Sequence, residues 1–161
     1  MLAGGSAFLT GLVVSLVLIS IWLDARLGLA PLLGPPLGLT VGLPVVASGL
    51  LLMAWPVGTF LRARGTPVPL NPPPRLVTSG PYARTRNPML TGVFIMLFGL
   101  GLLLGSASLV LLLTPLFILL IAVEIKLVEE PELERRLGRD YVDYRESVPM
   151  FVPWPGRRAR R

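Results

Sequence analysis

The sequence has 161 residues, of which 53% are hydrophobic and only 15% are charged, and its formal net charge is +6. A soluble domain of this length could not bury so much apolar surface, so the composition predicts an integral membrane protein with a single domain, 1–161. The chain contains no cysteine and no histidine. This excludes disulfides, the usual zinc sites and a histidine general base, and we expect no metal.

Two apolar segments occupy the first part of the chain. Residues 1–23 carry no charge, which predicts a membrane-spanning helix over about 7–23, before the charged Asp24 and Arg26. A second span is expected over about 37–61, because the prolines that precede it predict a loop. These prolines are Pro31, Pro35 and Pro36.

A polar connector, 62–87, separates these helices from a second uncharged stretch. Residues 87–123 are long enough for two short spans, expected over about 88–104 and 109–123. The sequence "GSAS" at 105–108 provides a turn signal between them. One long broken helix is the alternative.

A polar tail, 124–161, follows the fourth expected span. Leucines and tyrosines at helical spacing alternate with charges there, which predicts a cap of one or two amphipathic helices, with a break at Gly138 and a new N-cap at Asp140. Basic residues concentrate in the connector and the tail, so we expect both termini and the cap in the cytoplasm of a bacterium, with the helices in its inner membrane. Anionic membrane lipid is the expected partner, and no nucleic acid is expected.

Two polar clusters stand apart from ordinary solvated charge. One precedes the third expected span and contains Tyr82, Arg84, Arg86, Asn87 and Pro88; the other is Glu129 and Glu130. If the last two spans form an antiparallel hairpin, the clusters meet at one membrane face. Carboxylates bind ammonium or ribose groups and arginine binds carboxylates, so the combination suits a zwitterionic ligand with hydroxyls. Taken singly, the arginines are also typical of a topology signal, and the glutamates of a complement to a helix dipole.

The order of these residues is similar to that of a known family. The stretch "GPYARTRNPM" after "LVTS", with "EEPELERRLGRDYVDYRESVPMFVP" later in the chain, resembles the isoprenylcysteine carboxyl methyltransferase family and the broader phospholipid-methyltransferase-like membrane enzymes. The resemblance implies methyl transfer from S-adenosylmethionine to a lipophilic acceptor. It implies Arg86 and Glu129 as catalytic residues. It implies a cofactor pocket of Leu76, Val77, Tyr82, Arg86, Asn87, Pro88, Met89, Glu129 and Glu130.

The identity of the acceptor stays open. Relatives usually carry tyrosine at the position of Leu90, and relatives that methylate a prenylcysteine carboxylate carry arginine at the position of Ile125. An amine or hydroxyl acceptor would need a base, for which Glu129, Glu124 or Tyr82 are candidates. Two other functions compete with methyl transfer: an NADPH-dependent reductase of sterol-reductase-like organisation, and a non-enzymatic lipid-binding membrane module.

Overall fold

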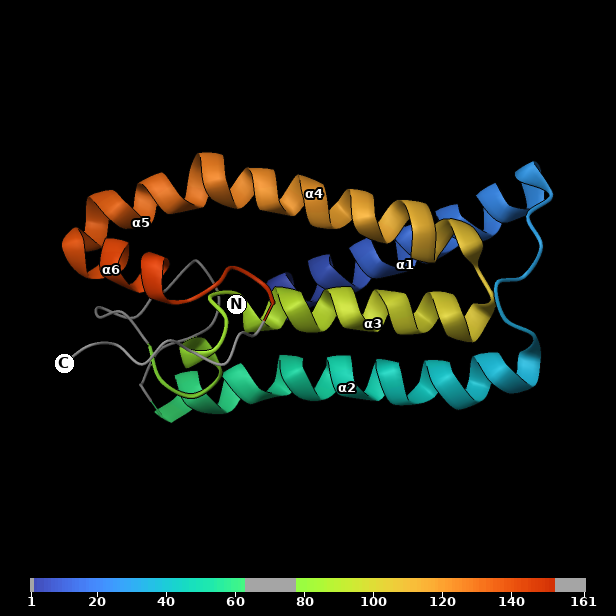
Figure 1. Ribbon diagram of the computed structural model, residues 1–161, viewed down its shortest axis with the longest axis horizontal. Coiled ribbons are helices and arrows are strands. Elements are labelled where there is room, and N and C mark those ends of the chain that lie inside the picture. The colour runs from blue at the N-terminus through green and yellow to red at the C-terminus, as the bar shows by residue number, and fades with distance from the viewer. Residues whose placement is uncertain (1, 63–77, 153–161) are drawn as a thin grey trace. The chain divides into compact units, whose positions relative to one another are not determined.

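The computed structural model describes residues 2–62 and 78–152, which are helical throughout apart from their connections (Figure 1). The first three long helices are α1 (Leu2–Leu27), α2 (Pro35–Arg62) and α3 (Pro88–Leu104), and a short 3₁₀ turn, η1 (Gly80–Ala83), precedes α3. A fourth, continuous helix then comprises η2 (Leu109–Leu113), α4 (Thr114–Glu124), η3 (Ile125–Glu129) and α5 (Glu130–Leu137). The last element is α6 (Arg139–Ser147).

The helices confirm the prediction of an all-α integral membrane protein. Three segments are long and apolar enough to cross a membrane, namely Leu9–Leu27, Pro35–Gly58 and Leu109–Leu137. The helix α3, with 17 residues, is apolar but shorter. The placement of both termini and the polar cap in the cytoplasm, and of the protein in a bacterial inner membrane, stays a prediction, as does the single domain.

The helix bounds differ from the expected ones at several places. The charged Asp24 and Arg26 lie inside α1, and Arg62, expected in the connector, is the last residue of α2. Pro35 and Pro36 form the first turn of α2 rather than a loop, because the missing N–H of proline is harmless there. The fourth helix continues past Val123 without a break.

The fourth helix contains two widened, π-helical segments, and each is followed closely by a proline. Pro115 follows η2, and Pro131 follows η3. Proline lacks an N–H and its ring crowds the carbonyl one turn earlier, and a widened turn accommodates both defects without ending the helix. The helix therefore remains continuous, but one extra residue per turn rotates everything beyond it by about 100°.

The chain divides into two compact units, Met1–Leu50 with Val93–Leu120, and Leu51–Gly92 with Ile121–Arg161. In the first unit, the rings of Phe94 and Phe117 meet edge to face, with centroids 5.7 Å apart. This contact joins α3 to α4, so the two helices form a hairpin and the expected turn after α3 is confirmed. The alternative of one long broken helix is wrong.

Glycines allow α2 and α3 to approach closely in the first unit. A Cβ atom on Gly42 would lie 2.7 Å from the backbone nitrogen of Leu103, and one on Gly99 would lie 2.6 Å from the nitrogen of Val46. Both distances are shorter than any side chain tolerates, so the backbones themselves are in contact at these positions. Small residues that bring backbones together are a common basis of helix association in membranes.

Asp24 explains why α1 continues past the expected end. Its Oδ1 accepts a hydrogen bond from the backbone N–H of Ser108 at 3.0 Å, and its Oδ2 accepts one from the Ser106 hydroxyl at 2.5 Å. The side chain therefore caps the start of the fourth helix from a neighbouring helix, as an N-cap residue would do within one chain segment. Ser108 in turn donates its hydroxyl to the carbonyl of Ser20 at 3.0 Å.

The second unit contains the helical cap. Gly138 adopts φ = 60° between α5 and α6, a conformation that favours glycine, and α6 folds back on α5 (Figure 1). The helix α6 begins at Arg139, so Gly138 is the N-cap in place of the expected Asp140. A small apolar core joins the two helices and consists of Leu133, Leu137, Tyr141, Tyr144 and Val148.

Candidate functional site

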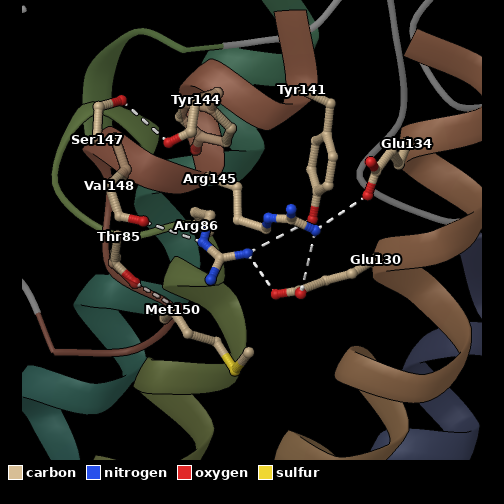
Figure 2. A network of polar contacts seen from close by, with 10 residues as sticks. All are labelled: Thr85, Arg86, Glu130, Glu134, Tyr141, Tyr144, Arg145, Ser147, Val148 and Met150. Carbon is tan, nitrogen blue, oxygen red and sulfur yellow. Dashed lines mark hydrogen bonds and ion pairs between the residues drawn. The ribbon is translucent and has the colours of Figure 1, made fainter. Parts of the chain in front are cut away.

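Arg86 is the centre of a polar network in the second unit (Figure 2). Its Nη1 donates a hydrogen bond to Oε1 of Glu130 at 2.6 Å and lies 3.5 Å from the hydroxyl of Tyr141. Its Nε donates to the carbonyl oxygen of Val148 at 3.0 Å. The side chains of Arg86 and Glu130 are each only 11% exposed, so their ion pair is short, charge-assisted and largely buried.

The residues that follow α6 lie along the turn that carries Arg86. The backbone N–H of Arg86 donates to the carbonyl of Pro149 at 2.9 Å, and that of Asn87 donates to the carbonyl of Met150 at 3.1 Å. The hydroxyl of Thr85 donates to the same Met150 carbonyl at 2.9 Å. The turn before α3 and the end of the cap therefore fix each other by hydrogen bonds between segments that are remote in sequence.

Glu130 bridges two arginines. Its Oε1 accepts from Arg86, and its Oε2 lies 3.8 Å from Nη1 of Arg145 on α6. The same Arg145 nitrogen lies 3.1 Å from Oε2 of Glu134 (Figure 2). A buried carboxylate is costly unless it is paired, and Glu130 meets this requirement with both of its oxygens.

Glu129 differs from its neighbour, because it is half-buried and makes no ion pair or hydrogen bond with residues 2–62 or 78–152. The charges of Arg86 and of the carboxylates Glu124, Glu130 and Glu132 act on it. The π turn η3 explains the difference between the two glutamates. Within this turn the N–H of Glu130 donates to the carbonyl of Ile125, so Glu130 and Ile125 share the buried face and Glu129 does not.

The three tyrosines of the chain all belong to this unit, and burial raises the pKa of each phenol. The negative charge of Glu129 raises the pKa of Tyr82 further, whereas Arg86 opposes the increase at Tyr141 and Tyr144. The Tyr144 hydroxyl donates to the carbonyl of Tyr82 at 2.7 Å. All three phenols are therefore neutral near pH 7, which leaves Tyr82 a poorer candidate base than a carboxylate.

The structure brings the expected site residues together to different degrees. Arg86 contacts Glu130 directly, while Glu129 and Tyr82 are joined by electrostatic interaction. Pro88, which is buried, and the half-buried Met89 begin α3 next to Asn87. Leu76 and Val77 lie outside the described residues. The roles of all these residues remain proposals.

Several residues of the network were missed in the sequence. Arg145 and Tyr141 contribute side chains, and Val148, Pro149 and Met150 contribute carbonyl oxygens. Tyr141 and Tyr144 pack in the small apolar core of the cap, and their hydroxyls also take part in hydrogen bonds, with Tyr141 accepting from Arg86 and Tyr144 donating to the carbonyl of Tyr82. The charge pattern could have pointed to Arg145, because Glu130 and Glu134 on α5 are followed by an arginine on the next helix, α6.

The fold and the network define a helical integral membrane protein whose second unit contains a largely buried ionic cluster. The family model described as phospholipid methyltransferase matches residues 37–140, which is more than half of the chain. The chain belongs to the phospholipid methyltransferase family, and this membership indicates a methyltransferase. The matched range includes Arg86, Glu129 and Glu130 but ends before Arg145. No curated protein and no solved structure matches the chain.

Proposed function

We propose that the protein transfers a methyl group from S-adenosylmethionine to a lipophilic acceptor reached from the bilayer, and that the acceptor is a phospholipid, as the family description suggests. One observation carries the proposal. The half-buried carboxylate of Glu129 lacks a partner among the described residues and lies within electrostatic reach of Arg86, whose guanidinium is anchored. A free anion beside a fixed cation suits a ligand that carries both charges.

The residues fit the chemical groups of this donor. S-adenosylmethionine carries an ammonium group, a carboxylate and two ribose hydroxyls. The Glu129 carboxylate can accept from the ammonium or from the hydroxyls, and the Arg86 guanidinium can donate to the carboxylate. Tyr82, whose phenol is neutral and lies within electrostatic reach of Glu129, belongs to the same part of the cap.

The chain's residues would mainly orient and shield the reactants. S-adenosylmethionine, when bound, supplies an already activated methyl group. The protein therefore contributes to catalysis mainly by aligning this group with the acceptor and by excluding water. A protonated phospholipid amine must lose a proton before its nitrogen can accept the methyl group. Glu124, an exposed carboxylate about one π-helical turn before Glu129, is the candidate proton acceptor in a chain without histidine.

Calorimetry with S-adenosylhomocysteine, the product form of the donor, tests the donor site in detergent-purified protein. Glu129→Gln is expected to weaken binding at least about tenfold, because one charge-assisted hydrogen bond is worth roughly 1.5–3 kcal/mol. Glu146→Gln removes the same charge from an exposed position on α6 and serves as the matched control. If the intact protein does not bind S-adenosylhomocysteine, the proposal is wrong, and a titration with NADPH then tests the reductase alternative.

Incubation with a labelled methyl donor and total membrane lipid identifies the acceptor. A labelled phospholipid is expected, and Glu124→Gln should lower kcat without raising KM for the donor. If the label appears in a prenylated compound or a fatty acid, the proposal of methyl transfer stands, but the assignment of a phospholipid as the acceptor is wrong. Retention of lipid without any label, together with an unaffected Glu129→Gln variant, would support a non-enzymatic lipid-binding module instead.

A further inference from the structure

We infer that Glu130 and Arg145 are positioning residues, which hold the guanidinium of Arg86 through Nη1 and leave its other terminal nitrogen, Nη2, for the carboxylate of the methyl donor. The inference rests on the proposed function and assigns different roles to the two glutamates of the site. Glu129 then contacts the donor, whereas Glu130, which the family resemblance places in the cofactor pocket, acts only through Arg86.

The hydrogen bonds of Arg86 show which of its nitrogens are held. An arginine has five N–H donors, one on Nε and two on each terminal nitrogen. The Nε donor is directed to Val148 O, and the Nη1 donors to Glu130 and Tyr141. Within the part of the chain that the structure describes, Nη2 makes no hydrogen bond, and it carries no dashed line in Figure 2. Three donors thus fix the guanidinium plane and two remain for a ligand.

The Glu130 carboxylate is already paired with two arginines. Each of its carboxylate oxygens faces a different arginine, at 2.6 Å for Arg86 and 3.8 Å for Arg145, and its side chain is 11% exposed. An ammonium or a ribose hydroxyl would have to compete with these arginines for a carboxylate that is largely removed from water. Glu129, which is half-buried and unpaired among residues 2–62 and 78–152, has no such obstacle.

Arg145 balances the charge that Glu130 alone would leave in excess. Two carboxylates, Glu130 and Glu134, face two arginines, Arg86 and Arg145, in one connected group. Without Arg145, Glu134 loses its ion-pair partner, and Oε2 of Glu130 loses the contact that helps to keep Oε1 directed at Arg86. The expected result is an Arg86 that retains its charge but loses its fixed orientation, and therefore a weaker donor site.

The experiment compares Arg145→Gln with Arg139→Gln. Both substitutions remove one positive charge from α6, but Arg139 is exposed and makes no ion pair with the described residues. Steady-state methylation should give a KM for the donor at least about fivefold higher in Arg145→Gln, with kcat changed less than about twofold, whereas Arg139→Gln should match the wild type. Arg145→Lys, which restores the charge, should recover part of the loss.

The orientation of Arg86 is also measured without any donor. Exchange of the Arg86 Nε–H with solvent, followed by NMR, should accelerate in Arg145→Gln and in Glu130→Gln and should stay slow in Arg139→Gln. Unchanged exchange and an unchanged KM in Arg145→Gln would overturn the inference. If exchange accelerates in Arg145→Gln but the wild-type protein does not bind S-adenosylhomocysteine, the positioning network is supported and the proposed function is rejected, so the two failures are distinguishable.

Discussion

Arg86 and Glu130 form a buried ion pair of 2.6 Å between a turn and a helix that are 44 residues apart in the chain. The pair fastens the start of α3 to the widened turn of the fourth helix within the second unit. Because both side chains are largely removed from water, each depends on the other for compensation of its charge. The geometry of the candidate site therefore depends directly on the stability of this cap.

Arg86→Ala should destabilise the protein strongly. The substitution leaves Glu130 buried without its nearest cation, and breaking a buried ion pair from one side typically costs about 3–5 kcal/mol. Thermal unfolding in detergent should show a lower midpoint, and the double variant with Glu130→Ala should lose less than the sum of the two single losses. Additive losses would mean that the two side chains do not interact in solution.

Pro131→Ala should disturb the site although residue 131 is not one of the expected ligands. Alanine restores the missing N–H, so the π turn η3 can close into an α-helical turn, and this change would rotate Glu130 by about 100° relative to the preceding helix. We expect faster Arg86 Nε–H exchange and weaker binding of S-adenosylhomocysteine, despite higher intrinsic helix propensity. Wild-type values for both measurements would show that the proline does not cause the widened turn.

The tyrosines should titrate only at strongly alkaline pH. Burial raises the pKa of Tyr82, Tyr141 and Tyr144 above the ordinary value of about 10, so the folded state holds these protons more tightly than the unfolded state. The stability they contribute is complete below pH ~10 and is lost as the pH rises towards the folded-state pKa values. Tyrosinate absorbance should therefore appear together with unfolding. A substantial tyrosinate signal at about pH 10 in the folded protein would contradict this.

Asp24→Ala should weaken the first unit. It removes the acceptor for the Ser108 N–H and the Ser106 hydroxyl, and the loss of such a cap typically costs about 1–2 kcal/mol. Asp24→Asn keeps one oxygen acceptor and should lose less. Thermal unfolding in the same detergent should give the lowest midpoint for Asp24→Ala and an intermediate one for Asp24→Asn. Equal midpoints for Asp24→Ala and the wild type would show that the cap is dispensable.

Gly42→Ala should destabilise the packing of α2 against α3. The new methyl group would meet the backbone of Leu103 at 2.7 Å, and overpacking of this kind typically costs about 1–3 kcal/mol. Gly58→Ala, in the same helix, meets nothing within 4 Å and should be neutral or stabilising by roughly 0.5–1 kcal/mol. Similar unfolding midpoints for the two variants would indicate that the helices separate easily enough to admit a side chain at residue 42.

The sequence predicted the helical membrane class, the turn after α3 and the two polar clusters, because each depends on local features. Runs of apolar residues long enough to cross a membrane, and glycine or serine between them, act over one segment at a time. The motif around Arg86 also indicated the family that the match over 37–140 then showed. Helix ends were less predictable, because they depend on contacts between segments that are remote in the sequence. The extension of α1 past Leu23 is an example, since Asp24 is hydrogen-bonded to Ser106 and Ser108, more than 80 residues later in the chain.

Composition and residue order by themselves determined that this chain is a membrane-embedded helical protein of a methyltransferase family with Arg86 and the Glu129–Glu130 pair at its polar end. Only the tertiary structure decided which glutamate pairs with Arg86. The family resemblance implied both glutamates in the cofactor pocket and Glu129 as a catalytic residue, and neither the resemblance nor the regular 3.6-residue turn of a helix separates their contacts. The widened turn before Pro131 adds a residue, which turns Glu130 to the buried face with Ile125 and leaves Glu129 free of a partner among the described residues.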